Sequence, residues 1–155
     1  MRPPGGASAP TTSLTPGGAI IDLQSLAREI CRRFYIRFPD ELKRSGDTGT
    51  AWCQHDNQYL LAWAIQEARD GTITFVDQSV WLARVLHSRG FPVEQLTENL
   101  LIASDLTRNH SELGPLAQST ADVLAAGADA VNRLDSSDFA EPDQADSDRV
   151  PNSSR

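Results

Sequence analysis

The chain has 155 residues, a formal net charge of −7 and 39% hydrophobic residues, which allows one folded domain with a modest core. The excess of Asp and Glu over Lys and Arg argues against nucleic acid as a main partner, because phosphate binding needs a basic surface. No apolar run of about 18 residues is present, so the sequence predicts no membrane span. The N-terminus lacks the apolar core of a secretory signal, and we therefore expect a cytoplasmic protein.

Both ends of the chain are poor in apolar residues. Residues 1–18 are rich in Pro, Gly, Ser and Thr, and residues 135–155 carry six acids against two arginines. Such segments bury too little apolar surface to offset the entropy lost on ordering. The sequence therefore predicts a disordered arm over 1–18, an all-helical domain over 19–134 and a disordered acidic tail over 135–155.

In the first half of the domain, apolar residues recur at every third or fourth position. The first predicted helix runs from Ala19 to Phe38, where Pro39 disfavours a helical conformation in the preceding residue. A short turn over residues 39–44 and a glycine-containing break follow. The second long helix is expected to cover residues 50–70.

Three more helices are predicted in the second half. One starts near Thr74 and stops at Gly90, the next opens at Pro92, and the last opens at Pro115 after a polar break. The strand-like run over residues 72–76 is too short and isolated to make a sheet. The fold class expected is an all-α bundle of about five to six helices.

Sequence signatures of common chemistries are missing. We find no glycine-rich phosphate loop before a helix and no nucleophile elbow, and the three histidines are far apart in sequence. Cys31 and Cys53 lie inside predicted helices at no metal-binding spacing, so we expect buried free thiols. The sequence predicts a protein that is not an enzyme and that holds no metal.

The segment WCQHDNQY places a carboxylate among aromatic residues, because Asp56 lies four residues after Trp52 and three before Tyr59 on one helix face. Either Asp56 pairs with an Arg or a Tyr hydroxyl across a helix interface, or it lines a ligand pocket. The tryptophans likewise either fill the core or form the wall of a cavity for a flat or extended apolar ligand. The candidates for such a pocket are Trp52, His55, Asp56, Tyr59, Trp63, Trp81 and Val85.

Four arginines lie on the flanks of the first predicted helix, with spacings of four residues within each pair. They form either a solvated face or a docking patch for an acidic partner or for the chain's own acidic tail. These residues are Arg28, Arg32, Arg33 and Arg37.

Two stretches resemble parts of a globin, and the resemblance covers roughly residues 20–134. The segment RRFYIRFPDELKRS resembles the part of a globin in which a helix ends in an aromatic residue and a Pro opens a short helix. The segment VWLARVLHSRGFPVEQLTENLL, with its Pro at position 92, resembles the globin turn between the proximal-side helix and the next long helix. The resemblance would place the proximal iron ligand at Val85, which cannot ligate, and the distal position near His55 or Asp56.

The globin resemblance therefore implies a globin-like fold that has lost heme, as in the non-heme sensor globins of bacterial stress signalling. A second resemblance, carried by the Cys53–Asp56 and Tyr59–Leu61 segments and by FVDQSVWLARVLHSRG, is to the helical module that precedes cobalamin-binding domains in bacterial regulators. Leu60 stands where that module has a His, and the Asp-x-His-x-x-Gly motif of the cobalamin domain is absent.

Three functions follow from these observations. The leading hypothesis is a non-enzymatic regulatory or sensory domain that acts through protein–protein contacts, with a pocket for a small apolar ligand. The first alternative is a heme- or tetrapyrrole-binding globin that uses His87 or His55 as ligand. The second is a homo-oligomeric scaffold or accessory subunit with Trp81 at an interface.

Overall fold

The computed structural model describes residues 8–140, and five α-helices account for most of them. The elements occur in the order β1 (Thr12–Leu14), β2 (Ile20–Asp22), α1 (Leu23–Arg37), α2 (Pro39–Asp70), α3 (Phe75–Ser88), α4 (Val93–Arg108), the 3₁₀ turn η1 (Ser111–Leu113), α5 (Leu116–Asn132) and the 3₁₀ turn η2 (Ser136–Phe139). The prediction of an all-α bundle of about five to six helices is therefore confirmed. Within the described residues, no helix has the length and apolar character needed to cross a membrane.

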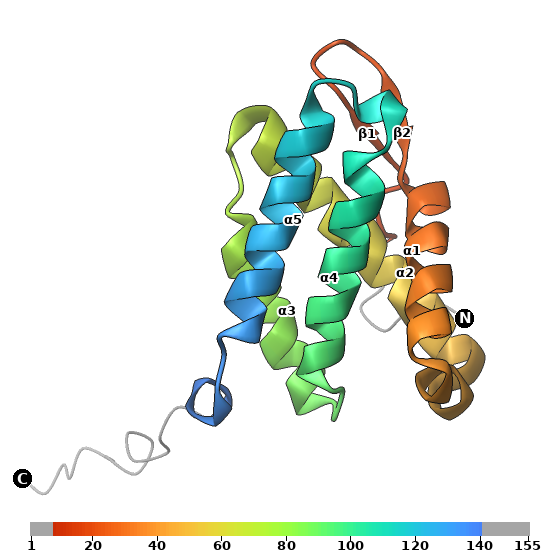
Figure 1. The fold of residues 1–155 in the computed structure, drawn as a ribbon, viewed down its shortest axis with the longest axis vertical. Helices are drawn as coiled ribbons and strands as arrows, with labels where there is room; N and C mark the ends of the chain where they lie inside the picture. The colour runs from red at the N-terminus through yellow and green to blue at the C-terminus, as the bar shows by residue number, and fades with distance from the viewer. Residues whose placement is uncertain (1–7, 141–155) are drawn as a thin grey trace, which may run out of the picture.

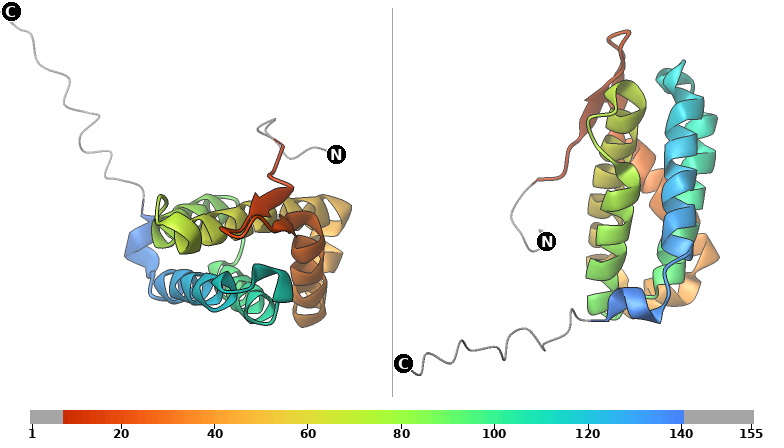
Figure 2. Two further views of the ribbon diagram at one scale, coloured as in Figure 1. Left: turned by 90° about the horizontal axis from the view of Figure 1, so that it is seen from above. Right: turned by 90° about the vertical axis from the view of Figure 1, so that its left-hand side faces the viewer.

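The helices form two layers (Figure 1). Figure 2 shows α2 beside α3 in one layer and α4 beside α5 in the other, while α1 covers one side of the bundle. In this arrangement α1 packs against both α2 and α4, and α5 packs against α3. The region where α1, α2, α3 and α4 approach one another lies at the end of the bundle away from the β-hairpin (Figure 1).

The start of α1 is set by a side-chain cap. The carboxylate of Asp22 accepts a hydrogen bond from the backbone N–H of Ser25 at 3.1 Å, which satisfies one of the unpaired donors of the first turn. For this reason α1 begins at Leu23 and not at Ala19, where the sequence pattern had placed it. Helix α1 ends at Arg37, one residue before the predicted end at Phe38, and Pro39 opens α2.

Helix α2 consists of two helical segments joined by a kink at Gly46, so the predicted break in this region is present. Gly46 has φ 58° and ψ −148°, a backbone conformation that is open to glycine and strained for other residues. The predicted turn over residues 39–44 is thus the first part of α2, and helical conformation resumes before Thr50. The bend brings the first turns of α2 back toward its own later part and toward α1.

A two-stranded hairpin occupies part of the segment predicted to be a disordered arm. Strands β1 and β2 pair antiparallel, with Ser13 opposite Ile21, and the Ile21 side chain is fully buried. That one inward-facing isoleucine anchors the hairpin to the bundle, because its burial offsets part of the ordering cost. Residues 8–18 therefore differ from the prediction, and residues 1–7 lie outside the described range.

The beginning of the predicted acidic tail is also ordered. Asp135 and Asp138 form a reciprocal capping box around η2, and the ring of Phe139 stacks on His87 with centroids 4.3 Å apart. The helical unit thus extends to residue 140. The remainder of the predicted tail, residues 141–155, lies outside the described residues.

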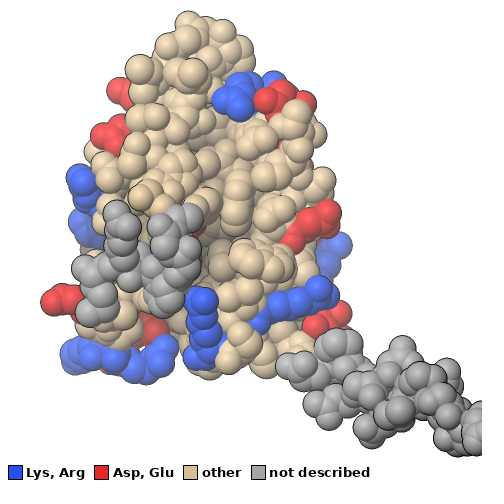
Figure 3. Space-filling model, turned by 180° about the vertical axis from the view of Figure 1, so that it is seen from behind, with Lys and Arg blue, Asp and Glu red and all other residues tan. Residues whose placement is uncertain are grey.

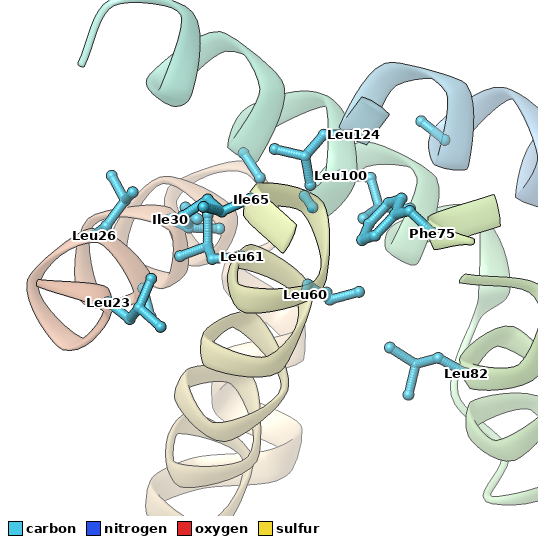
Figure 4. Packing of buried hydrophobic residues seen from close by; sticks show 14 of the residues in the cluster. Leu23, Leu26, Ile30, Leu60, Leu61, Ile65, Phe75, Leu82, Leu100 and Leu124 are labelled. Atoms are coloured by element: carbon cyan, nitrogen blue, oxygen red, sulfur yellow. The ribbon is translucent and has the colours of Figure 1, made fainter. Parts of the chain in front are cut away.

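Large aliphatic side chains from every helix meet in a single core (Figure 4). Leu60 of α2, Phe75 of α3, Leu100 of α4 and Leu124 of α5 are all fully buried in it. The absence of a side chain at Gly127 lets α5 approach α3 closely, since a Cβ atom there would lie 2.4 Å from the Phe75 ring. The core occupies the middle of the bundle and leaves space at one end, where the candidate site lies.

Candidate functional site

A pocket of about 400 Å³ lies where α1, α2, α3 and α4 approach one another. We refer to it as the central pocket. Most of its wall is apolar, and the side chains responsible come from all four helices and from the α3–α4 turn. They are Phe34, Leu60, Leu82, Leu86, Phe91 and Leu96. A volume of this size and a mostly apolar wall are typical of small-molecule sites.

A few charged groups lie in the wall of the central pocket. The guanidinium carbon of Arg89 lies 4.8 Å from the centroid of the Trp52 ring, in a cation–π contact. Glu41 is buried and accepts a hydrogen bond from Nε of Arg44 at 3.1 Å. Trp52 and Asp56, which the sequence had placed in a pocket, both line this one.

The Asp56 carboxylate is largely buried, with 22% of its side chain exposed. Burial raises the pKa of this carboxyl group, and the hydrogen bond with His55 and the charges of His55 and Arg89 oppose that rise. Its Oδ1 atom lies 3.2 Å from Nδ1 of His55. The predicted pairing with an Arg or a Tyr hydroxyl across a helix interface is not seen, since the neighbour on the same helix takes that place.

We expect Asp56→Asn to stabilise the fold at neutral pH and to leave it unchanged near pH 3. A folded-state pKa above the unfolded value of 3.8 means that the unfolded chain loses this proton first as the pH rises. The carboxyl group therefore costs stability above its folded pKa and nothing below the unfolded one. Urea denaturation of both chains at about pH 3 and about pH 7 measures the difference. Greater stability of the wild type at neutral pH would show that the bond to His55 outweighs burial.

The floor of the pocket contains an amide pair that sequence reasoning missed. Asn57 and Asn99 are both buried, and each side chain donates a hydrogen bond to the other, at 3.0 and 2.9 Å. The pair links α2 to α4. The sequence shows that each Asn lies next to the apolar stripe of its helix, which is compatible with burial. It does not show that the two side chains face each other.

The remaining pocket candidates on α2 lie outside the central pocket. His55, Tyr59 and Trp63 form an aromatic ladder with Trp52, with ring centroids 5.6, 5.1 and 5.5 Å apart in succession. His55, Tyr59 and Trp63 are not among the residues that line the central pocket, although Trp52 at the start of the ladder is. The prediction that they line the pocket is therefore corrected.

The two candidates on α3 also lie outside it. Trp81 is 55% exposed, and Val85 is half-buried without lining the central pocket. The pocket-facing positions of α3 are Leu82 and Leu86, four residues apart on one face. Each predicted residue is therefore one position before a residue that lines the pocket. Apolar residues lie on several sides of α3, so the sequence pattern does not show which side faces the pocket.

Neither histidine proposed as a heme ligand is placed for that role. His87 is exposed and stacks on Phe139, and His55 faces Asp56 instead of the central pocket. An axial ligand must project into the cavity that holds the porphyrin. Neither His87 nor His55 is therefore placed to ligate a heme in the central pocket.

The arginine patch of α1 is exposed and largely paired within the molecule. Arg32 and Arg33 contact Glu29 at 2.7 and 3.2 Å, and Arg33 also lies 3.6 Å from Asp105 of α4. Arg37 lies 3.9 Å from Glu98 of the same helix. Within residues 8–140, Arg28 makes no ion pair. Arg33 and Arg37 thus connect α1 with α4, while Arg32 is paired within α1.

Among residues 8–140, no group of three or more His, Cys, Asp or Glu side chains is arranged to hold a metal ion. Searches against protein-family models, curated proteins and solved structures found no match for this chain. The conclusion that the site supports is therefore drawn from its geometry: a largely apolar pocket with an arginine, a buried aspartate and an amide pair in its wall.

Proposed function

We propose that this chain is a regulatory or sensory helical domain that binds a small, mostly apolar ligand in the central pocket and acts through protein contacts instead of catalysis. The observation that carries the proposal is the pocket itself. Its volume of about 400 Å³ is within the range of small-molecule sites, and its few polar groups suit recognition of one end of a ligand. The resemblance of the sequence to sensor globins supports the same function. We include in this proposal that the bundle is globin-like.

The distribution of groups in the wall suggests the shape of the ligand. The apolar wall from Leu60, Leu82 and Leu96 suits a flat or extended hydrocarbon body. Arg89 and Asp56 suit one polar group at its end, since the Arg89 guanidinium makes no ion pair within 4.0 Å in residues 8–140. A purely polar ligand would leave most of this wall uncovered.

A groove on the outer side of α1 supports a role in protein contacts. This α1 groove has a volume of about 440 Å³ and is lined by Arg28, Arg32, Ile36 and Leu42, among others. Ile36 is 66% exposed and Leu42 is 41% exposed, so an apolar strip lies beside two cationic side chains. Such a surface suits an amphipathic acidic segment of a partner protein.

Self-association is a second way in which the chain can act through contacts, and the exposed Trp81 supports it. Figure 3 shows one face of the molecule whose middle carries uncharged residues, with charged side chains mostly toward its edges. Light scattering at micromolar concentration tests this second candidate. A strictly monomeric chain would reject a homo-oligomeric scaffold and leave the ligand-binding proposal unchanged.

The ligand-binding proposal is tested by titrating the full chain with 1-anilinonaphthalene-8-sulfonate, an apolar fluorophore with one anionic group. We expect saturable binding by the wild type and a loss of about tenfold or more in affinity for Leu86→Trp, because the indole ring occupies the pocket. Val85→Trp is the matched control, since it adds the same ring one position away and outside the pocket. Its affinity should stay within about twofold of wild type.

Three outcomes would count against this proposal. Absence of saturable binding by the wild type, or an equal loss in both tryptophan variants, would show that the dye does not report on the central pocket. Each chain must also unfold cooperatively, because loosely packed states bind the same dye. Turnover of any bound compound would refute the non-enzymatic part.

A further inference from the structure

The two cysteine side chains meet at the interface between α1 and α2. The side-chain nitrogen Nδ2 of Asn57 lies 3.7 Å from Sγ of Cys31 and 3.5 Å from Sγ of Cys53. The Cys31 thiol is also the largest influence on the pKa of Cys53, which it raises. Both cysteines are free. Two thiols from different helices are thus neighbours in the folded chain.

Each sulfur faces a different hollow of the surface. Cys53 lines the central pocket and Cys31 lines the α1 groove, while Tyr35 lines both. The thiol pair therefore stands in the wall that separates the two hollows. Open space therefore reaches one cysteine residue from each hollow.

The surroundings of the pair favour uncharged sulfur. The pKa of the Cys53 thiol is raised, first by the hydrogen bond with Cys31 and then by burial, with the charge of Asp56 adding to the effect. Ionisation of Cys53 places a charge in a poorly solvated site, so the thiolate that attacks a peroxide is scarce there. A disulfide carries no charge and therefore suits this site, and its formation is expected to be slow near neutral pH and faster as the pH rises.

We propose that Cys31 and Cys53 are an oxidation site at which a hydroperoxide forms an intramolecular disulfide between α1 and α2. One thiol loses its proton, its sulfur attacks a peroxide oxygen and the O–O bond breaks, which gives a sulfenic acid and, with hydrogen peroxide, one water. The second sulfur attacks the sulfenic sulfur, the S–O bond breaks, and the oxygen leaves as another water with the second thiol's proton. Two thiols and one hydrogen peroxide thus give one disulfide and two waters.

The bond would join the two helices that form the wall of the central pocket. The bond would also change the contacts of both sulfurs with Nδ2 of Asn57, which donates a hydrogen bond to Asn99 as well. The inference does not depend on the proposed ligand, since the oxidation chemistry needs only the pair and a peroxide. Oxidation is expected to raise Tm, because a cross-link between distant residues restricts the unfolded chain.

The experiment treats the full native chain with hydrogen peroxide, blocks remaining thiols with N-ethylmaleimide and measures the intact mass. The wild type should lose the mass of two hydrogen atoms, take up no maleimide and return to the starting mass with dithiothreitol. Cys31→Ser and Cys53→Ser should each form no intramolecular disulfide. Sulfinic acids without loss of hydrogen, or disulfides only between chains, would overturn the inference.

A destabilised variant tests whether the folded state is the one that reacts. Leu100→Ala removes part of the core without touching either cysteine and raises the unfolded population. If the native pair reacts, this variant should form the disulfide at a rate within about twofold of the wild type. A rate that rises in proportion to the unfolded population would place the reaction in the unfolded chain and overturn the inference.

Discussion

Leu100→Ala is expected to destabilise the fold by about 2–5 kcal/mol, the usual cost of a large cavity in a packed core. Leu100 is fully buried, and Figure 4 shows it among side chains from α2, α3 and α5. Its truncation removes the hydrophobic contribution of the lost atoms and leaves a hole that rigid helices fill only partly. Because the total stability of small domains is about 5–15 kcal/mol, this single change consumes a large part of it.

The neighbouring residue provides the matched control. Leu101 on the same helix is 44% exposed, so Leu101→Ala should change the free energy of unfolding by about 0.5 kcal/mol or less. Urea denaturation followed by circular dichroism measures both variants against the wild type. Equal losses in the two variants would contradict the placement of α4 in the bundle, since only one face of that helix should be sensitive.

The Asn57–Asn99 amide pair should show strong coupling when it is replaced. Asn57→Leu leaves both polar atoms of the Asn99 amide without their partner in a buried site, which costs about 1–3 kcal/mol. Asn99→Leu leaves Oδ1 of Asn57 without its partner, while Nδ2 of Asn57 keeps its hydrogen bond to the Cys53 carbonyl at 3.0 Å. Replacing both residues by leucine removes the unpaired groups together, so the double variant should recover most of the stability lost in either single variant.

A double-mutant cycle in urea measures this coupling, which we expect at about 1–3 kcal/mol. The control is internal to the cycle, because each single variant carries the same added volume as half of the double variant. If the double variant loses the sum of the two single losses, the amides do not act as a pair. The floor of the central pocket would then need a different description.

The helices themselves could be predicted well from local signals. The periodic apolar residues mark α1, α3, α4 and α5, and Pro39, Pro92 and Pro115 lie within a residue of helix starts. These signals are local because a helix closes its hydrogen bonds within four residues. The hairpin was missed because its anchor is a single buried residue, Ile21, in a segment of low overall hydrophobicity. Gly46 interrupts the helical conformation as expected, but the second segment of α2 resumes before Thr50, where the sequence pattern had placed its start.

The candidate site could be predicted only in part. Asp56 and Trp52 were found because a carboxylate four residues from an aromatic ring is unusual on an apolar face, and both line the pocket. Arg89 was not found, since its role depends on the Trp52 ring across the α2–α3 interface. Trp81 was assigned to the pocket on its size alone, and it lies outside the pocket because α3 turns Leu82 inward instead.

The amino-acid sequence by itself determined the fold class, the positions of the main helices and the absence of paired metal ligands at helical spacing. The tertiary structure alone decided which groups meet: Cys31 with Cys53, Asn57 with Asn99, and Arg89 with Trp52. The physical reason is that helical periodicity specifies which residues share a face but carries no information on the opposing surface. That surface is set by how five amphipathic helices share one core, a property of the whole chain.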